Sequence, residues 1–127
     1  MSIEKQTVEL LKSKKLKLAT AESCTGGLIS KRITDVSGSS EVFEGGVVCY
    51  SNRFKEKCAR RFPGNPKKYG AVSRETAREM VKGVLSLTKA DIAVAVTGIA
   101  GPSSDDTNKP VGLVYIAVSD GKSTIVK

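Results

Sequence analysis

The segment ATAESCTGG at residues 19–27 contains two possible nucleophiles, Ser23 and Cys24, just before a pair of glycines. The chain contains no histidine, so a serine here cannot use the imidazole base of the usual catalytic triad. A lysine, a tyrosine or a carboxylate would have to accept its proton. We interpret Cys24, which also lacks a histidine partner, as a packing residue. A purely structural alternative is that Ser23 or Thr25 caps a helix.

Possible bases for Ser23 lie in a second polar segment near the middle of the chain. Lys55 could accept the proton if burial or nearby positive charge lowered its pKa, and Arg53 and Lys57 are its neighbours in sequence. Tyr50 could pass the proton on or orient the amine. In the structural alternative, Lys55 belongs to a solvated charged helix and Tyr50 to the hydrophobic core.

A helix that begins in this first segment would place backbone N–H groups and a positive dipole end beside the serine. The N–H groups of Thr25, Gly26 and Gly27 are therefore predicted to hold an oxyanion or a phosphate. We interpret Glu22 as an accessory group that holds the nucleophile or the lysine in place.

A third polar segment, TGIAGP at residues 97–102, follows the apolar run DIAVAV. Its glycines could let the backbone approach the phosphate or sugar of a ligand, so Thr97 and Gly98 are candidate binding residues. The same pattern is typical of tight turns, which often need glycine.

The elements that must position these residues alternate along the chain. Apolar periodicity predicts helices at residues 3–14, 25–34, 52–61 and 73–88, and strands at 16–21, 46–50, 91–96, 111–118 and 123–126. This alternation predicts a layered α/β/α domain with a largely parallel, mixed central sheet, in which the last two strands add an antiparallel edge. Sites in such sheets form beyond the carboxyl ends of the strands. The three polar segments are therefore predicted to meet in one crevice.

The length of 127 residues is typical of one domain, and we expect residues 1–127 to form a single unit. No apolar run approaches the roughly 18 residues that a membrane-spanning helix needs. We therefore expect a soluble, cytoplasmic protein with no membrane partner.

The net charge of +8, from 21 Lys and Arg against 13 Asp and Glu, favours an anionic partner. Few aromatic residues are present and they do not alternate with the basic ones, so nucleic acid is the less favoured anion. The three cysteines, Cys24, Cys49 and Cys58, are widely spaced and form no CxxC pair. Without histidine they do not predict a metal site, and we expect reduced, mostly buried thiols.

Four motifs, in this order, carry a resemblance to a known family: TAESCTGGLIS, GGVVCYSNRFKEK, GAVSRETAREM and AVTGIAGPSSDDTNKPVGLVYIAV. Together they resemble the C-terminal CinA domain, the family of bacterial nicotinamide-nucleotide amidases. The resemblance implies hydrolysis of the carboxamide of nicotinamide mononucleotide to nicotinic acid mononucleotide and ammonia. It implies Ser23, Tyr50 and Lys55 as catalytic residues and requires no metal or organic cofactor.

The resemblance also suggests further properties of the site and of the assembly. Thr97, Gly98 and Lys109 are candidates for contacts to the ribose phosphate of a pyridine nucleotide. A homo-oligomer, such as a dimer, is expected, and the chain resembles a stand-alone form of the domain with a short C-terminus.

Two alternatives to the amidase stay open from the sequence. Residues 103–106, SSDD, replace a glycine-rich run that is usual in the family, and this departure favours a catalytically silent nucleotide-binding module. The positive charge and the competence and DNA-damage context of the family name favour a nucleic-acid-binding protein.

Overall fold

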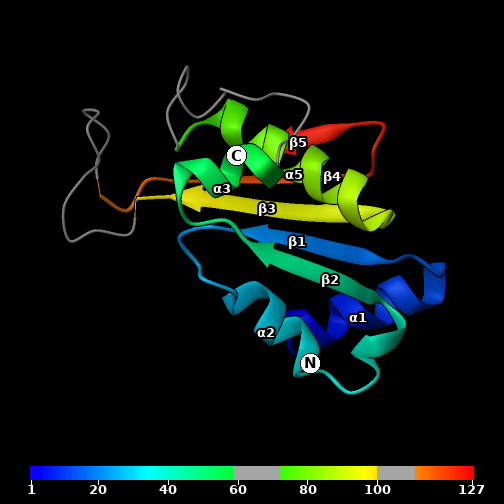
Figure 1. The fold of residues 1–127 in the computed structure, drawn as a ribbon. Helices are drawn as coiled ribbons and strands as arrows, with labels where there is room; N and C mark the ends of the chain where they lie inside the picture. The colour runs from blue at the N-terminus through cyan, green and yellow to red at the C-terminus, as the bar shows by residue number, and fades with distance from the viewer. Residues whose placement is uncertain (59–71, 100–110) are drawn as a thin grey trace.

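The described part of the structure, a computed structural model, comprises residues 1–58, 72–99 and 111–127. It contains a five-stranded sheet with the strand order β2-β1-β3-β4-β5 (Figure 1). The strands are β1 (Leu18–Glu22), β2 (Phe43–Val48), β3 (Ile92–Gly98), β4 (Val114–Ser119) and β5 (Thr124–Val126). The helices are α1 (Ile3–Lys14), α2 (Leu28–Thr34), α3 (Asn52–Cys58) and α5 (Arg74–Thr88), with a 3₁₀ turn, η1 (Ser39–Glu41).

The sheet is mixed, with a parallel half and an antiparallel half. β1 pairs in parallel with both β2 and β3, whereas β4 runs antiparallel to β3 and β5 antiparallel to β4. The starts of β1 and β3 are aligned by Asp91, whose carboxylate accepts from the Lys17 N–H at 2.8 Å while its own N–H donates to the Lys17 carbonyl at 2.9 Å. The predicted α/β class and antiparallel edge are confirmed.

Helices cover both faces of the sheet, with α1 and α2 on one side and α3 and α5 on the other (Figure 1). The α5 face is built on alanines in the strands, which let the helix lie close to the sheet. These fully buried alanines are Ala19, Ala21, Ala93, Ala95 and Ala117. The helix contributes Met80, Val81 and Val84, each with no exposed surface. The apolar periodicity predicted for this helix is therefore confirmed.

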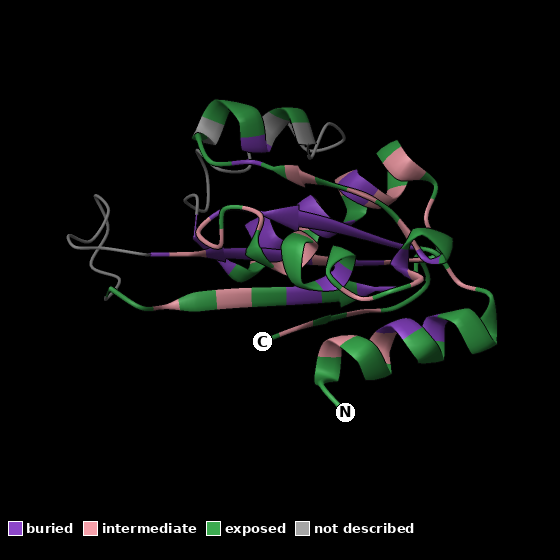
Figure 2. Cartoon of the chain, turned by 90° about the horizontal axis from the view of Figure 1, so that it is seen from below, coloured by how far each residue is buried: buried purple, intermediate pink, exposed green. Residues whose placement is uncertain are grey.

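A second core cluster fills the opposite face of the sheet. Val8 and Leu11 of α1 and Ile33 of α2 pack there with Leu18 and Val42. Figure 2 shows the resulting pattern, in which buried residues dominate the middle of the sheet while α1 is buried along one side only. The chain therefore folds around two apolar layers that sandwich the parallel strands.

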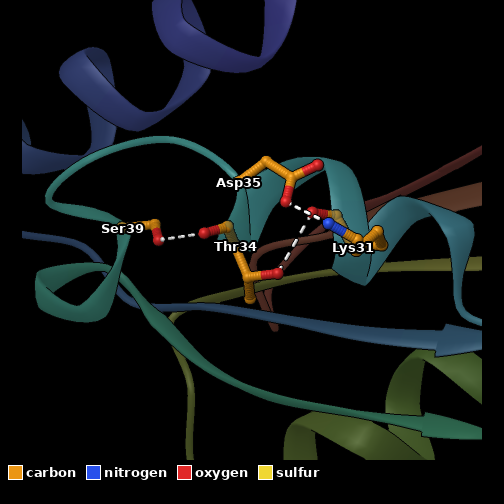
Figure 3. A network of polar contacts seen from close by, with 4 residues as sticks. All are labelled: Lys31, Thr34, Asp35 and Ser39. Atoms are coloured by element: carbon orange, nitrogen blue, oxygen red, sulfur yellow. Dashed lines mark hydrogen bonds and ion pairs between the residues drawn. The ribbon is translucent and has the colours of Figure 1, made fainter.

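Local hydrogen bonds determine where the helices begin and end. Ser73 caps α5, as predicted, because its Oγ accepts from the Thr76 N–H at 3.1 Å. At the C-terminal end of α2, Lys31 pairs with Asp35, and the carbonyl of Thr34 accepts from Ser39 Oγ at 3.4 Å (Figure 3). These contacts tie α2 to the turn that leads into β2.

Three predicted boundaries are corrected by the structure. β2 begins at Phe43 and, among the described strands, lies at the edge of the sheet; its exposure alternates, so it is not a strand buried on both faces. β3 continues through Thr97 and Gly98, since these residues pair with β4. α2 begins at Leu28 and not at Thr25. The helix predicted at 52–61 is described only as far as Cys58.

One cysteine differs from the expectation of reduced thiols. Cys49, which is fully buried just after β2, is disulfide-bonded, whereas Cys24 is free and half-buried. The expectation was wrong at Cys49 because spacing along the sequence does not report distance in the fold. Among the described residues, no helix combines the length and apolar character needed to cross a membrane.

Candidate functional site

Ser23 lies at the point where the connections of the parallel strands diverge. β1 has β2 on one side and β3 on the other, and ligands in α/β sheets bind beyond the carboxyl ends of strands at such a switch point. Ser23 directly follows β1, its side chain is 3% exposed, and its N–H donates to the carbonyl of Val96 at 3.0 Å. The candidate nucleophile is therefore held against β3.

Lys55 is brought to the same edge by α3. The start of this helix is capped by Ser51, whose Oγ accepts from the Phe54 N–H at 3.1 Å. Lys55 is only 3% exposed, and its Nζ donates to Oγ1 of the fully buried Thr97 at 3.2 Å. The alternative that Lys55 is a solvated member of a charged helix is wrong. Lys55 is therefore a buried, hydrogen-bonded side chain at the carboxyl end of β3.

Tyr50 lies between β2 and α3, close in sequence to Lys55, but its side chain is 73% exposed. The alternative that it belongs to the hydrophobic core is wrong. Tyr50 precedes the helix that contains Lys55, but it is exposed whereas Lys55 is buried. Its catalytic role stays a prediction.

Glu22 is fully buried at the end of β1, and its carboxylate is saturated with donors. One oxygen accepts from Thr25 Oγ1 at 2.7 Å and the Ile29 N–H at 2.8 Å, and the other from the N–H and Oγ of Ser30 at 2.9 and 2.7 Å. Burial raises the pKa of this carboxyl, but the hydrogen bonds outweigh it and leave the pKa below 4.5. Glu22 was predicted to hold Ser23 or Lys55; these contacts show that it anchors the start of α2.

The contacts of Glu22 change which backbone donors are available near the serine. The Ile29 and Ser30 N–H groups are used by the carboxylate, and the Gly26 N–H donates to the Ser23 carbonyl at 3.0 Å. Gly27, whose φ of 104° lies in the left-handed region that favours glycine, has an N–H without an acceptor among the described residues. The oxyanion donors predicted in this segment are thus reduced, with Gly27 the clearest of them.

Cys24 packs against the end of β3, in agreement with the interpretation as a packing residue. A Cβ at Gly98 would lie 2.9 Å from Cys24 Sγ and 2.8 Å from Val114 Cγ2, so only glycine fits at position 98. Burial raises the pKa of the Cys24 thiol, although its own N–H, Lys55 and the Thr25 N–H act in the opposite direction. The thiol is therefore less nucleophilic than an ordinary cysteine at neutral pH.

The predicted residues of the third segment fall into two groups. Thr97 and Gly98 lie inside β3, where the first has no exposed surface and contacts Lys55, and the second is packed under Cys24. Lys109 and residues 103–106 lie outside the described residues. No group of three His, Cys, Asp or Glu side chains that could hold a metal ion is found within the described ranges.

These features define a layered α/β domain in which a serine and a lysine are each buried at the carboxyl ends of the central strands of a mixed sheet. The chain belongs to the CinA C-terminal domain family, whose model matches residues 1–127. This membership confirms the resemblance carried by the four motifs.

Individual relatives agree with this assignment. The chain is 50% identical over 125 residues to a protein of Thermoanaerobacter sp. (strain X514) that is provisionally named a competence-damage inducible protein. The match covers 98% of this chain and 30% of the relative. It is 46% identical over 125 residues to a CinA-like protein of Thermotoga neapolitana, covering 98% of this chain and 31% of that protein. The chain thus spans about a third of the length of these curated relatives.

Solved structures show the same fold. The competence/damage inducible protein CihA from Agrobacterium tumefaciens is 39% identical, with a TM-score of 0.91 over 98% of this chain and 76% of that one. The competence damage-inducible protein A from Klebsiella pneumoniae is 31% identical, with a TM-score of 0.93 over 98% of this chain and 77% of that one.

Proposed function

We propose that this chain hydrolyses the carboxamide of nicotinamide mononucleotide to nicotinic acid mononucleotide and ammonia. The observation that carries the proposal is the burial of Ser23 and Lys55 at one sheet edge in a chain that has no histidine. Membership of the CinA C-terminal domain family, which includes such amidases, supports it.

In the proposed mechanism, Ser23 Oγ attacks the carbonyl carbon of the amide while the neutral amine of Lys55 accepts the hydroxyl proton. The tetrahedral intermediate collapses, the C–N bond breaks, and Lys55 returns the proton to the leaving nitrogen, which departs as ammonia. Water then attacks the acyl-enzyme while Lys55 accepts one of its protons, the bond between the acyl carbon and Ser23 Oγ breaks, and Lys55 passes the proton to Ser23 Oγ as the acid product leaves.

The surrounding residues have assigned roles in this scheme. The Gly27 N–H is the proposed oxyanion donor, because it has no acceptor among the described residues and lies in the loop that the Glu22 contacts hold in place. Thr97 is a positioning residue that acts through its hydrogen bond with Lys55. Tyr50, which is exposed between β2 and α3, is proposed to contact the substrate or the amine once a ligand is bound, since catalytic hydrogen bonds often tighten only in the complex.

The phosphate contact and the oligomeric state are further parts of the proposal. Lys109 is proposed to contact the phosphate of the pyridine nucleotide, and the net charge of +8 would steer this anionic substrate toward the protein. A homo-oligomer, such as a dimer, is also part of the proposal.

The test is to incubate the protein with nicotinamide mononucleotide and to measure ammonia and the acid product. We expect turnover by the wild type and a decrease in kcat of roughly 10³-fold or more for Ser23→Ala, because the nucleophile is removed. Ser39→Ala is the matched control, since Ser39 is also a buried serine but lies in η1, before β2.

Two outcomes would contradict the amidase. If Ser23→Ala is as active as the wild type, the mechanism is wrong. If pyridine nucleotides raise the melting temperature without any product, the chain is a silent nucleotide-binding module. Affinity for oligonucleotides that falls steeply with salt would instead support nucleic-acid binding.

A further inference from the structure

A second concave surface lies far from Ser23, between the C-terminal half of α5 and the turn that joins β4 to β5. This groove has a volume of about 850 Å³, within the usual range for small-molecule sites. It lies at the other end of β3, because Ala90 precedes that strand and Ser119 pairs with Ala93 near its beginning. Six or seven residues of strand, roughly 20 Å at about 3.3 Å per residue, separate the groove from the candidate active site.

The groove is lined by basic side chains from three parts of the chain. The four are Arg78, Lys82, Lys89 and Lys122. None of the described residues that line the groove is acidic, and its remaining lining is hydroxyl groups and a small apolar floor that includes Leu85 and Ala90. The basic residues are therefore concentrated in the groove and not only spread evenly over the protein surface.

Two basic residues of α5 lie on one side of the helix, and a third follows its end. Arg78 and Lys82 are four residues apart, whereas Lys89 is the C-cap residue in the left-handed conformation. Like charges at this spacing repel each other, and among the described residues Arg78, Lys89 and Lys122 form no ion pair. A bound anion would relieve this repulsion.

Lys122 faces these basic residues from a turn whose conformation is well determined by hydrogen bonds. The Asp120 carboxylate accepts from the Lys122 and Ser123 N–H groups, each at 2.9 Å. Ser119 Oγ accepts from the Gly121 N–H at 3.1 Å and from Thr124 Oγ1 at 3.0 Å. Since these bonds order the backbone of the turn, only the exposed Lys122 side chain loses conformational freedom when it binds an anion.

Negative charges also lie near the groove, but none of its described lining residues carries one. The C-terminal end of α5 contributes about half a negative charge. Glu79, one turn before Lys82, is the nearest acid on the helix; burial raises the pKa of its carboxyl, and Lys82 acts in the opposite direction. Asp120 is oriented toward the backbone of its own turn. The described lining of the groove is therefore basic, and the nearby acidic groups lie outside it.

We propose that this groove binds a small polyphosphorylated ligand, such as a nucleoside triphosphate or inorganic tripolyphosphate, at a site separate from the amidase centre. Several phosphates in a row would match cations that come from both walls of the groove. A single-stranded nucleic acid is less favoured, because no aromatic side chain among the described lining residues offers a stacking surface for bases. The proposal does not depend on the amidase activity.

The experiment measures binding of inorganic tripolyphosphate to the full chain by isothermal titration calorimetry at low salt. Lys82→Glu combined with Lys122→Glu reverses one charge on each wall, and we expect the dissociation constant to rise roughly tenfold or more. The control combines Lys5→Glu with Lys14→Glu, which changes the net charge equally on the exposed side of α1. This control should change the dissociation constant by less than about threefold.

Each remaining outcome decides the proposal. Equal losses in both pairs of variants would show that binding follows net charge alone and would overturn the site. If tripolyphosphate does not bind the wild type, but a single-stranded oligonucleotide does and loses affinity in the groove variant, the surface binds nucleic acid and the proposal is wrong. Circular dichroism of both variants shows whether each is folded, and unchanged ammonia release by the groove variant would show that the two sites are separate.

Discussion

The two ends of the sheet present the same residue type in opposite environments. At the carboxyl end of β1 and β3, Lys55 is 3% exposed and hydrogen-bonded to a buried threonine. At the other end, Lys82 and Lys122 are exposed on the walls of a groove. A buried amine is suited to exchange a proton, whereas an exposed ammonium stays charged and attracts anions. The comparison shows that position in the fold decides the environment of a lysine, and the two proposals assign different chemistry to these environments.

The same comparison changes how the net charge of +8 is interpreted. The count alone indicates an anionic partner, but it does not say where the partner binds. The structure gathers four cations at the end of the sheet that is away from Ser23. The charge therefore supports two separate proposals, a substrate at one edge and a polyphosphate at the other.

The largest expected effect distinguishes the buried lysine from an exposed one on the same helix. Lys55→Met keeps the length of the side chain but removes the amine, and we expect kcat for ammonia release to fall about 10²- to 10⁴-fold, the usual contribution of an acid–base group. Lys57→Met, at an exposed position of α3, is the matched control. Equal activity in the two variants would remove Lys55 from the mechanism.

The next effect concerns α5, which supports the sheet with one face and forms the groove with the other. Met80→Ala removes a fully buried side chain, and we expect the free energy of unfolding to fall by about 2–5 kcal/mol. Leu87→Ala, at a position that is 59% exposed on the same helix, should cost less than about 1 kcal/mol. Urea denaturation measures both. Similar losses would mean that the buried face of α5 is assigned wrongly.

The smallest of these effects tests the loop that carries Ser23. Glu22→Gln replaces one carboxylate oxygen by an NH₂ group, which would face N–H and O–H donors instead of accepting from them. We therefore expect the free energy of unfolding at neutral pH to fall by about 1–3 kcal/mol. Because the pKa of Glu22 is lowered in the folded state, its contribution is present above pH 4.5 and is lost as the pH falls through the folded pKa.

Urea denaturation at neutral pH and at about pH 3 measures the difference in unfolding free energy between the wild type and Glu22→Gln. This difference depends on pH because it follows the protonation of Glu22. The wild type and Glu22→Gln should approach the same stability in acid. Glu9→Gln, at an exposed carboxylate of α1, is the control. A difference between wild type and Glu22→Gln that is independent of pH would contradict the lowered pKa.

The fold class and most elements were predictable because they depend on local pattern. The apolar spacing of residues 73–88 and the capping serine at position 73 identify α5 with nearly correct ends. The run at residues 91–96 similarly predicts a buried strand, although β3 extends to Gly98 because β4 pairs with its end. The edge position of β2 was not predictable, since strand order depends on which side of β1 the chain returns to.

Ser23 and Lys55 became candidates from the sequence alone, through the absence of histidine and the four family motifs. The tertiary structure decided their environments, because these depend on contacts between residues far apart in the chain. The hydrogen bond of Lys55 joins it to a residue 42 positions away. Glu22 binds donors on α2 only because the loop folds back over it, and the cations of the groove meet only when α5 lies against the β4–β5 hairpin. Residue types and local periodicity are properties of the sequence, whereas burial and charge clustering arise when distant segments pack together.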